Sequence, residues 1–312
     1  MSEYHSPVLL KEVLEGLNLG KREGGVFLDC TCGGGNHSYA VLESNPTISL
    51  IGIDKDDEAI AESERRLAKF QGRFRLFRTD YKNYADVLDE AGIDKLDGFL
   101  VDLGISSHQI DDERRGFAYN KPDAPLDMRM DRRVKLTAET VVNEYPPEAL
   151  RKILREYGEE SFAGSIVSRI VKEREKEPIR TAGRLKEIIE ASVPPQYRFH
   201  ACARKTFQAI RIEVNGELNG LSEFVKSLTM RLKTGARGCI ITFHSLEDRI
   251  VKNVFRELAA GCVCPKNLPV CVCGRKKEIE LVGKQPIVAD EKEIEENSRS
   301  KSAKLRIALK IT

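Results

Sequence analysis

The sequence predicts an α/β protein in which a doubly wound parallel sheet is interrupted by an inserted all-helical domain. Three observations predict it: short apolar runs alternate with amphipathic stretches over the first hundred residues, this β pattern stops near Asp111, and it resumes after Ile212. An insertion describes such a chain more economically than two domains in a row. We therefore predict a first sheet segment over 1–110, a helical insert over 111–212 and a second sheet segment over 213–312.

Four apolar runs predict the parallel strands of the first segment. Three of these runs end in or beside an acid, Asp29, Asp54 or Asp102. In open α/β sheets the carboxyl ends of the strands face the ligand crevice, so these acids mark its predicted position. An amphipathic helix is predicted from Glu58 to Leu67. The predicted strands are 26–29, 49–54, 74–78 and 98–102.

Helical spacing dominates the insert, and strand patterns return after it. Pro147 suits a first helical turn, Leu150 and Leu154 continue one apolar face, and Gly158 suits the helix end. Further helices are predicted over 162–173, 183–191 and 218–232. Later strands are predicted over 238–243, 278–282 and 305–310, and the polar stretch 290–302 predicts a solvated helix and loop.

Composition and charge exclude some classes of protein. No apolar run approaches the ~20 residues that cross a bilayer, and the N-terminus lacks the pattern of a secretory signal, so we expect a cytosolic protein. The 51 cations nearly balance the 49 acids, giving a net charge of +2. Any surface for nucleic acid must therefore be local. The sequence says nothing of the oligomeric state.

A glycine-rich loop follows the first predicted strand and points to a cofactor. It reads DCTCGGGNH from Asp29, with Gly33 and Gly35 able to let a ligand approach the backbone closely. Asp54 closes the next strand, where an acid can accept both ribose hydroxyls of a nucleoside. A dinucleotide site would place glycine where Ser38 stands, so the pattern D-x-x-x-G-x-G favours S-adenosylmethionine. A tight turn without a ligand is the alternative.

Two further strand ends carry polar residues that could act on a substrate. After the fourth strand come Asp102, Ser106 and Gln109, at the place where enzymes that methylate exocyclic amines hold the amine in line with the methyl donor. His244 follows the fifth strand among acids, bases and hydroxyls. The alternatives are a capped turn for the first group and a core histidine for the second. The catalytic candidates are Asp102, Ser106 and His244.

Local clusters of cations and aromatic residues suggest contacts with RNA. Cations bind phosphate while aromatic faces stack on unpaired bases, and the stretch 196–212 combines both kinds without an acid. An ordinary solvated helix face is the alternative. The candidate RNA contacts are Arg115 and Arg129 in the loop 114–131, Arg198, Arg204 and Lys205 in 196–212, and Arg299 and Lys304 in the C-terminal tail.

Eight cysteines in a chain of this kind suggest thiols or a metal site rather than a disulfide framework. Four of them form two C-x-C pairs, and four thiolates can bind zinc. In zinc sites, however, about two to four residues commonly stand between the cysteines of a pair, and here only one does. A reduced, packed cysteine loop is the alternative, so no metal is assigned. The four residues are Cys262, Cys264, Cys271 and Cys273.

Together these motifs resemble one family, the bacterial 16S ribosomal RNA cytosine-N4 methyltransferases of the MraW type. The resemblance runs nearly end to end, in blocks at 5–10, 102–107, 115–117, 125–131, 157–160, 207–212, 214–215, 243–249 and 302–306. It implies a Rossmann-like class I methyltransferase domain with an inserted helical domain. It also implies S-adenosylmethionine as methyl donor and a cytosine in the decoding centre of the small ribosomal subunit as substrate.

The resemblance also implies which residues contact the cofactor. These are Gly35, Asn36, His37, Asp54, Tyr81, Asp102 and Gln109. The sequence departs from the family at Asn36, where glycine is usual, and at His108 and Ser298, where proline is common. Asparagine tolerates positive φ better than most residues, so Asn36 is compatible with binding.

For the reaction we expect N4 of a splayed-out cytosine to attack the methyl group directly, with its base-pairing edge held near Ser106 and His244. Attack at N4 needs no cysteine nucleophile, so serine variants of the cysteines near the strand ends should stay active. Two rival functions remain open from the sequence: methylation of a small molecule or protein, and RNA binding by a non-catalytic ribosome assembly factor.

Overall fold

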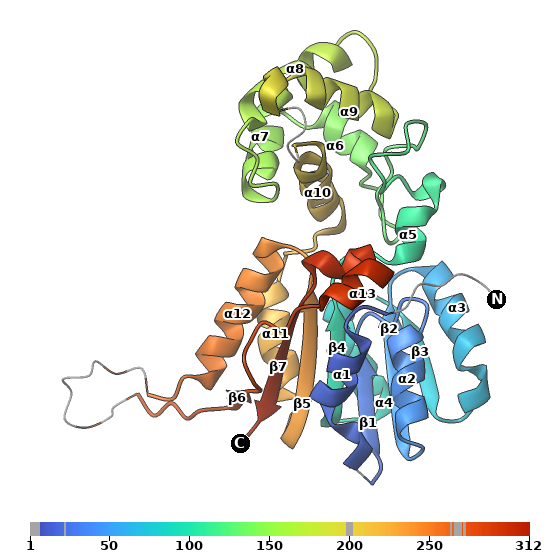
Figure 1. Cartoon of the computed structure of the whole chain (residues 1–312), viewed down its shortest axis with the longest axis vertical. Helices are drawn as coiled ribbons and strands as arrows, with labels where there is room; N and C mark the ends of the chain where they lie inside the picture. Colours follow the sequence, from blue (N-terminus) through green and yellow to red (C-terminus); the bar gives the residue numbers. More distant parts are fainter. Residues whose placement is uncertain (1–6, 22, 198–201, 263, 265–269, 271–272) are drawn as a thin grey trace. The chain divides into compact units, whose positions relative to one another are not determined.

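The structure is a computed structural model, and it describes residues 7–21, 23–197, 202–262, 264, 270 and 273–312. The chain forms two compact units (Figure 1). Met1–Gly104 and Gly220–Thr312 make the first, here called the sheet unit, and Ile105–Asn219 makes the second, the helical unit. Both boundaries between the units lie several residues from the predicted ones, after Gly104 and after Asn219. At the second boundary, helix α10 (Cys202–Asn215) continues past residue 212, and the Asn215 side chain forms hydrogen bonds with the backbone of Met128 and Met130.

A seven-stranded sheet with the order β3-β2-β1-β4-β5-β7-β6 forms the centre of the sheet unit. Strands β1 to β5 run parallel, whereas β7 runs antiparallel to both β5 and β6. The strand order reverses between β1 and β4, which places the ligand crevice at their carboxyl ends. The predicted doubly wound α/β fold is confirmed. The strands are β1 Gly25–Asp29, β2 Ile48–Asp54, β3 Phe74–Arg78, β4 Leu96–Asp102, β5 Leu232–Thr242, β6 Ile279–Leu281 and β7 Lys304–Lys310.

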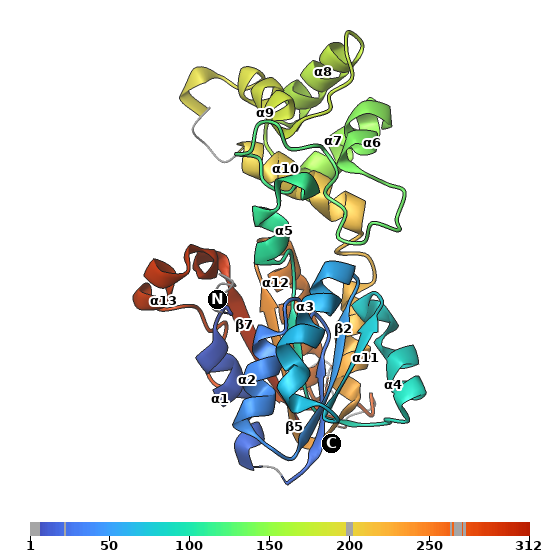
Figure 2. The same ribbon diagram turned by 90° about the vertical axis from the view of Figure 1, so that its right-hand side faces the viewer.

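Helices cover both faces of this sheet. Figure 2 shows α1 and α2 on one face and α4 and α11 on the other. Val13 and Leu17 of α1 pack with Phe27 and Leu50 of the strands in one buried apolar cluster, which holds these layers together. The helices are α1 Leu10–Leu17, α2 Asn36–Ser44, α3 Asp57–Leu67, α4 Tyr84–Ala91, α11 Leu221–Met230, α12 Ser245–Ala259 and α13 Glu291–Glu296.

Two sequence predictions in the sheet unit need correction. Leu232, predicted as the last residue of a helix, instead begins β5, where it pairs with Leu96 of β4. The stretch 290–302, predicted to be solvated, is attached to the unit because the Glu293 carboxylate accepts hydrogen bonds from Leu9 N and from the buried hydroxyl of Ser300. Apolar periodicity could not reveal this attachment, since polar groups make it.

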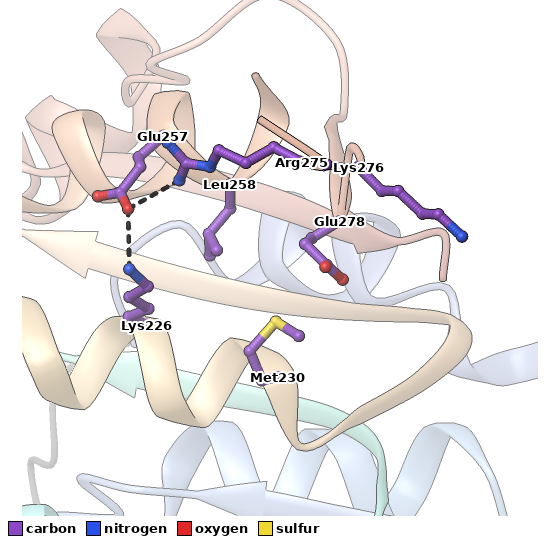
Figure 3. Close-up of a pocket in the computed structure, with 8 residues that line it drawn as sticks. Lys226, Met230, Glu257, Leu258, Arg275, Lys276 and Glu278 are labelled. Atoms are coloured by element: carbon purple, nitrogen blue, oxygen red, sulfur yellow. Dashed lines mark hydrogen bonds and ion pairs between the residues drawn. The ribbon is translucent and has the colours of Figure 1, made fainter. Parts of the chain in front are cut away.

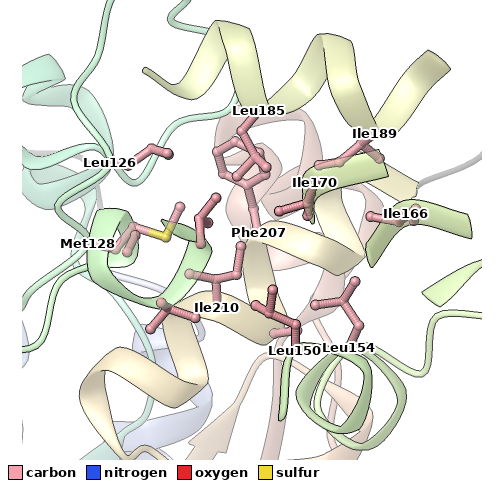
Figure 4. Packing of buried hydrophobic residues seen from close by; sticks show 14 of the residues in the cluster. Leu126, Met128, Leu150, Leu154, Ile166, Ile170, Leu185, Ile189, Phe207 and Ile210 are labelled. Carbon is pink, nitrogen blue, oxygen red and sulfur yellow. The ribbon is translucent and has the colours of Figure 1, made fainter. Parts of the chain in front are cut away.

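The helical unit encloses a separate apolar core. Ile153 and Leu154 of α7 and Ile166 of α8 pack in one cluster with Phe207 and Ile210 of α10 (Figure 4). Helix α7 begins at Pro147, which has no N–H to leave unpaired in a first turn. The other helices of the helical unit are α5 Ser107–Asp111, α6 Ala138–Glu144, α8 Ala163–Arg174, α9 Ala182–Ala191 and α10.

A repeated Asp-x-Arg pattern orders the long loop of the helical unit. In each repeat the aspartate accepts a hydrogen bond from the backbone N–H of the arginine two residues later and forms an ion pair with the guanidinium of that arginine. One of these pairs engages Arg129, a candidate RNA contact. The pairs are Asp112 with Arg114, Asp127 with Arg129, and Asp131 with Arg133.

Among the described residues, no helix is both long and apolar enough to cross a bilayer.

Candidate functional site

The glycine-rich loop lies along the carboxyl ends of β1, β2 and β4. Cys30 N donates to Leu100 O of β4 at 2.9 Å, and Cys32 N donates to Ile53 O of β2 at the same distance. Gly33 N then donates to the Asp54 carboxylate at 2.9 Å. The loop therefore reaches from one side of the predicted crevice to the other.

Gly33 and Gly35 of this loop have different roles. Each has a positive φ, 51° at Gly33 and 79° at Gly35. A side chain added at Gly35 would meet the Ser63 hydroxyl at 3.0 Å, so packing against α3 requires this glycine. At Gly33 an added side chain would meet only Thr31 O, at 3.9 Å, so its face is open to a ligand.

Asn36 is the first residue of α2 and does not have positive φ. The departure from glycine at this position therefore leaves the loop conformation intact.

Asp29 holds the loop from below, where it is fully buried. One carboxylate oxygen accepts from Thr31 N and the other from the Ser38 hydroxyl, at 3.2 and 2.6 Å. Burial raises the pKa of Asp29 to about 6. The acid that leads the motif thus serves the loop and has no oxygen without a hydrogen bond.

Asp54 also accepts two hydrogen bonds, from Gly33 N and Asp56 N at 2.9 Å each. Burial raises its pKa to about 6, against the lowering effect of both bonds. Each carboxylate oxygen has a second acceptor position. The geometry therefore suits an acid that is held rigidly and can still accept two hydroxyl groups.

Asp102 differs from the other two acids because one of its oxygens is unsatisfied. Its backbone N–H donates to the Thr31 hydroxyl at 2.6 Å, which fixes the strand end. Its Oδ1 is buried and has no hydrogen-bond partner among the residues that the structure describes. Burial, followed by the charges of Asp29 and Glu247, raises the pKa of Asp102 to about 8. A largely protonated acid with a free acceptor oxygen is typical of a functional site.

His37 lies beside this acid, with Nδ1 at 3.8 Å from Asp102 Oδ2. Its Nε2 lies 3.0 Å from Val8 O, a contact that requires the proton on Nε2 and leaves Nδ1 without one. Burial lowers the pKa of His37 to about 4, so the ring is neutral at neutral pH. The pair therefore offers an unprotonated nitrogen and a carboxyl group side by side.

His244 caps the start of α12 through one ring nitrogen. Its Nδ1 accepts from Glu247 N at 3.4 Å, and Glu247 Oε2 accepts from Phe243 N at 2.9 Å. The side chain of His244 is buried, and its Nε2 lies 3.1 Å from Glu247 Oε1 but makes no hydrogen bond with the residues that the structure describes. The Nδ1 contact fits a core histidine and the unsatisfied Nε2 fits a functional one, so both alternatives stay open.

The remaining predicted cofactor and substrate residues also have structural contacts. The ring of Tyr81 lies 4.6 Å from that of Phe224 on α11. In the helical unit, Gln109 N donates to the Ser106 hydroxyl and Gln109 Oε1 accepts from Ser106 N, which caps α5. Ser106 and Gln109 come soon after Asp102 in the sequence. They belong to the helical unit, whereas Asp102 belongs to the sheet unit.

Of the predicted RNA contacts, Arg115 must be withdrawn. It is 2% exposed, and its guanidinium donates to Arg129 O and Met130 O at 3.0 Å, so it offers no surface to RNA. The sequence could not reveal the burial of Arg115, because arginine is usually exposed. Lys205 donates to Glu159 O. Of the others, Arg129 and Lys304 are ion-paired, Arg204 is exposed, Arg299 is half-buried, and Arg198 lies outside the described residues.

The cysteines near the strand ends are buried, and burial raises the pKa of the Cys30, Cys32 and Cys239 thiols. Protonated thiols are poor nucleophiles, which supports a reaction without a cysteine intermediate.

The chain is similar to known proteins along its whole length. The profile of the MraW methylase family matches residues 2–311. Proteins named ribosomal RNA small subunit methyltransferase H are 45% identical in Clostridioides difficile strain 630, over 100% of both chains, and 48% identical in Citrifermentans bemidjiense, over 99% of both. A solved rRNA methylase from Streptococcus thermophilus aligns over 97% of this chain and 94% of its own, with 11% identity and a TM-score of 0.39.

Proposed function

This chain belongs to the MraW methylase family, and we propose that it methylates the N4 amine of a cytosine in the decoding centre of 16S rRNA. Ribosomal RNA as substrate and S-adenosylmethionine as methyl donor follow from the family and from relatives 45% and 48% identical over the whole chain. N4 and the decoding centre go beyond those names. They are supported by the family resemblance and by the chemistry available at Asp102.

The observation that carries the proposal is the buried, unpaired Oδ1 of Asp102 at the switch point of the sheet. An exocyclic amine carries two N–H donors, and an unpaired carboxylate oxygen is an acceptor for one of them. The N4 lone pair is conjugated into the cytosine ring, so holding the amine in line with the methyl group and removing its proton both favour attack.

The residues around the loop fit a nucleoside with a cationic centre. Gly33 leaves backbone open to a ligand, and Asp54 has acceptor positions for two ribose hydroxyls. S-adenosylmethionine supplies a methyl carbon on a positively charged sulfur, which keeps the bonding electron pair when N4 takes the methyl group. Three buried acids at adjacent strand ends favour such a cation.

A proton must leave N4 as the new N–C bond forms. Asp102 Oδ1, when ionised, can take it directly, and the unprotonated Nδ1 of His37 lies 3.8 Å from the other carboxylate oxygen. Ionisation of Asp102 is therefore required, which makes its raised pKa part of the reaction.

The test is product identification. Small subunits and free 16S rRNA from cells that lack this modification are incubated with the enzyme and methyl-labelled S-adenosylmethionine, alongside a protein extract. The RNA is then digested to nucleosides and separated. Label in N4-methylcytidine supports the proposal. Label in another nucleoside or in protein, or no label at all, would contradict it, and these outcomes correspond to the two rival functions.

A further inference from the structure

A long loop joins α12 to β6. It connects Ala259 to Ile279, and none of its described residues belongs to a helix or a strand. Loops longer than about 12–15 residues without secondary structure are uncommon in compact domains. Val270 in this loop is 70% exposed, so its described apolar side chain adds nothing to a core.

Hydrogen bonds and ion pairs hold the base of the loop. Glu278 N donates to Leu258 O at 3.0 Å, which brings the two ends together. Arg275 pairs with Glu257 of α12, and Glu257 also accepts from Lys226 of α11 (Figure 3). These charges line a pocket beside the loop base, where Glu257 pairs with both cations.

Three cysteine sulfurs gather above this base. The Sγ atoms of Cys262, Cys264 and Cys273 all lie within 4.8 Å of one another. The pair Cys262 and Cys273, from the two ends of the loop, is 3.8 Å apart. A disulfide would require about 2.05 Å. Two sulfurs bound tetrahedrally to one zinc ion with bonds of about 2.3 Å stand about 3.8 Å apart, which matches this pair.

A backbone contact adds to the match. Cys264 N lies 3.4 Å from Cys262 Sγ and donates to it. A hydrogen bond to sulfur stabilises the thiolate, which is the form that binds a metal.

We propose that this thiol cluster binds one structural zinc ion. Cys262, Cys264 and Cys273 are ligands of this ion. Cys271 lies outside the described residues. Each thiol releases its proton to the solvent as its sulfur binds, and the oxidation state of the metal does not change. Cys262 and Cys273 come from the two ends of the loop, so one ion bound to both sulfurs holds these ends together.

The close spacing also argues against an iron–sulfur cluster. In a [4Fe–4S] cluster each cysteine binds a different iron atom, and in a [2Fe–2S] cluster one iron atom binds only two cysteines. Three sulfurs that all lie within 4.8 Å of one another therefore fit a single shared ion better. Tetrahedral sites made only of thiolates take zinc or iron–sulfur clusters, and the observed separation favours zinc.

The first test measures metal in the full chain, purified without a histidine tag or chelator under reducing conditions. Elemental analysis should find one zinc per chain. Cys262→Ser and Cys273→Ser should each lose it, whereas Cys202→Ser, which changes a buried thiol of α10 in the helical unit, should retain it. Wild-type protein without stoichiometric zinc, or with iron in its place, would overturn the proposal without any variant having to fold.

The second test uses Co²⁺ as a probe on metal-free, reduced wild-type protein. Thiolate-to-cobalt charge-transfer bands in the near ultraviolet and strong d–d bands in the red should appear, and Zn²⁺ should displace them. Zinc removal should lower the melting temperature, and zinc addition should restore it. Absence of these bands, or a disulfide found by thiol counting in the native protein, would overturn the proposal. Neither test depends on methyl transfer.

Discussion

Replacing Asp102 by asparagine should stabilise the folded chain above pH 5 while stopping methyl transfer. The pKa of this carboxyl rises from 3.8 to about 8 on folding, mainly because of burial. The unfolded chain ionises near pH 4 and the folded chain only near pH 8, so the folded state loses stability as pH rises between these values. Asparagine keeps the shape and removes the charge, so it removes this loss.

The size of the effect follows from the shift. About four pKa units at about 1.4 kcal/mol each set a ceiling of about 6 kcal/mol. The Asp102 side chain is 25% exposed, so solvent screens part of this, and we expect a gain of about 2 kcal/mol at pH 8. At pH 4 the two proteins should be nearly equal. Urea unfolding from pH 4 to pH 8, without cofactor, measures the difference.

Asp97→Asn is the matched control, because Asp97 lies near the opposite end of the same strand. Its carboxylate accepts from Val26 N and pairs with Lys233, at 2.8 and 2.7 Å. Losing these contacts should destabilise the chain by about 1–3 kcal/mol. If Asp102→Asn also destabilises the chain at pH 8, or if its effect does not vary with pH, then Asp102 is a structural acid and the reasoning fails.

Four other predictions concern the same site, the buried Arg115 and the RNA surface. The methyl-transfer rate should rise with pH through about 8, because Asp102 must be ionised to accept the proton, and a rate that is flat from pH 6 to pH 9 would exclude this role. Asp54→Ala should weaken S-adenosylmethionine binding at least tenfold in titration calorimetry while the chain stays folded by circular dichroism, and unchanged affinity would remove Asp54 from the site. Arg115→Ala should lower the free energy of unfolding by about 3 kcal/mol, because its buried hydrogen bonds are lost. Arg204→Ala should leave unfolding unchanged and reduce the salt dependence of RNA binding by about one ion, and an unchanged salt dependence would remove Arg204 from the RNA surface.

The sheet was predictable because its parallel strands are buried on both faces and read as continuous apolar runs. The run ending at Asp102 is an example: β4 is buried from Leu96 to Val101. The glycine loop was predictable from local backbone conformation. Gly33 has a positive φ, which few residues other than glycine adopt.

The contacts of polar residues were not predictable from the sequence. Arg115 looked like a phosphate contact and is buried against backbone carbonyls, because a distant part of its loop folds over it. Ser106 and Gln109 cap α5, an alternative that the sequence offered but could not choose. The pKa of Asp102 depends on burial and on two acids from other elements, Asp29 at the end of β1 and Glu247 in α12, which no local pattern contains.

The most direct test of the account maps the methyl group to one nucleotide. Small subunits lacking the modification are treated with wild-type enzyme or with Asp102→Asn, and the decoding-centre oligonucleotides are analysed by fragment mass spectrometry. The account predicts one added methyl group, on N4 of a cytosine, with wild-type enzyme, and none with the variant. A methyl group at carbon 5 or on the ribose, or full methylation by the variant, would contradict it.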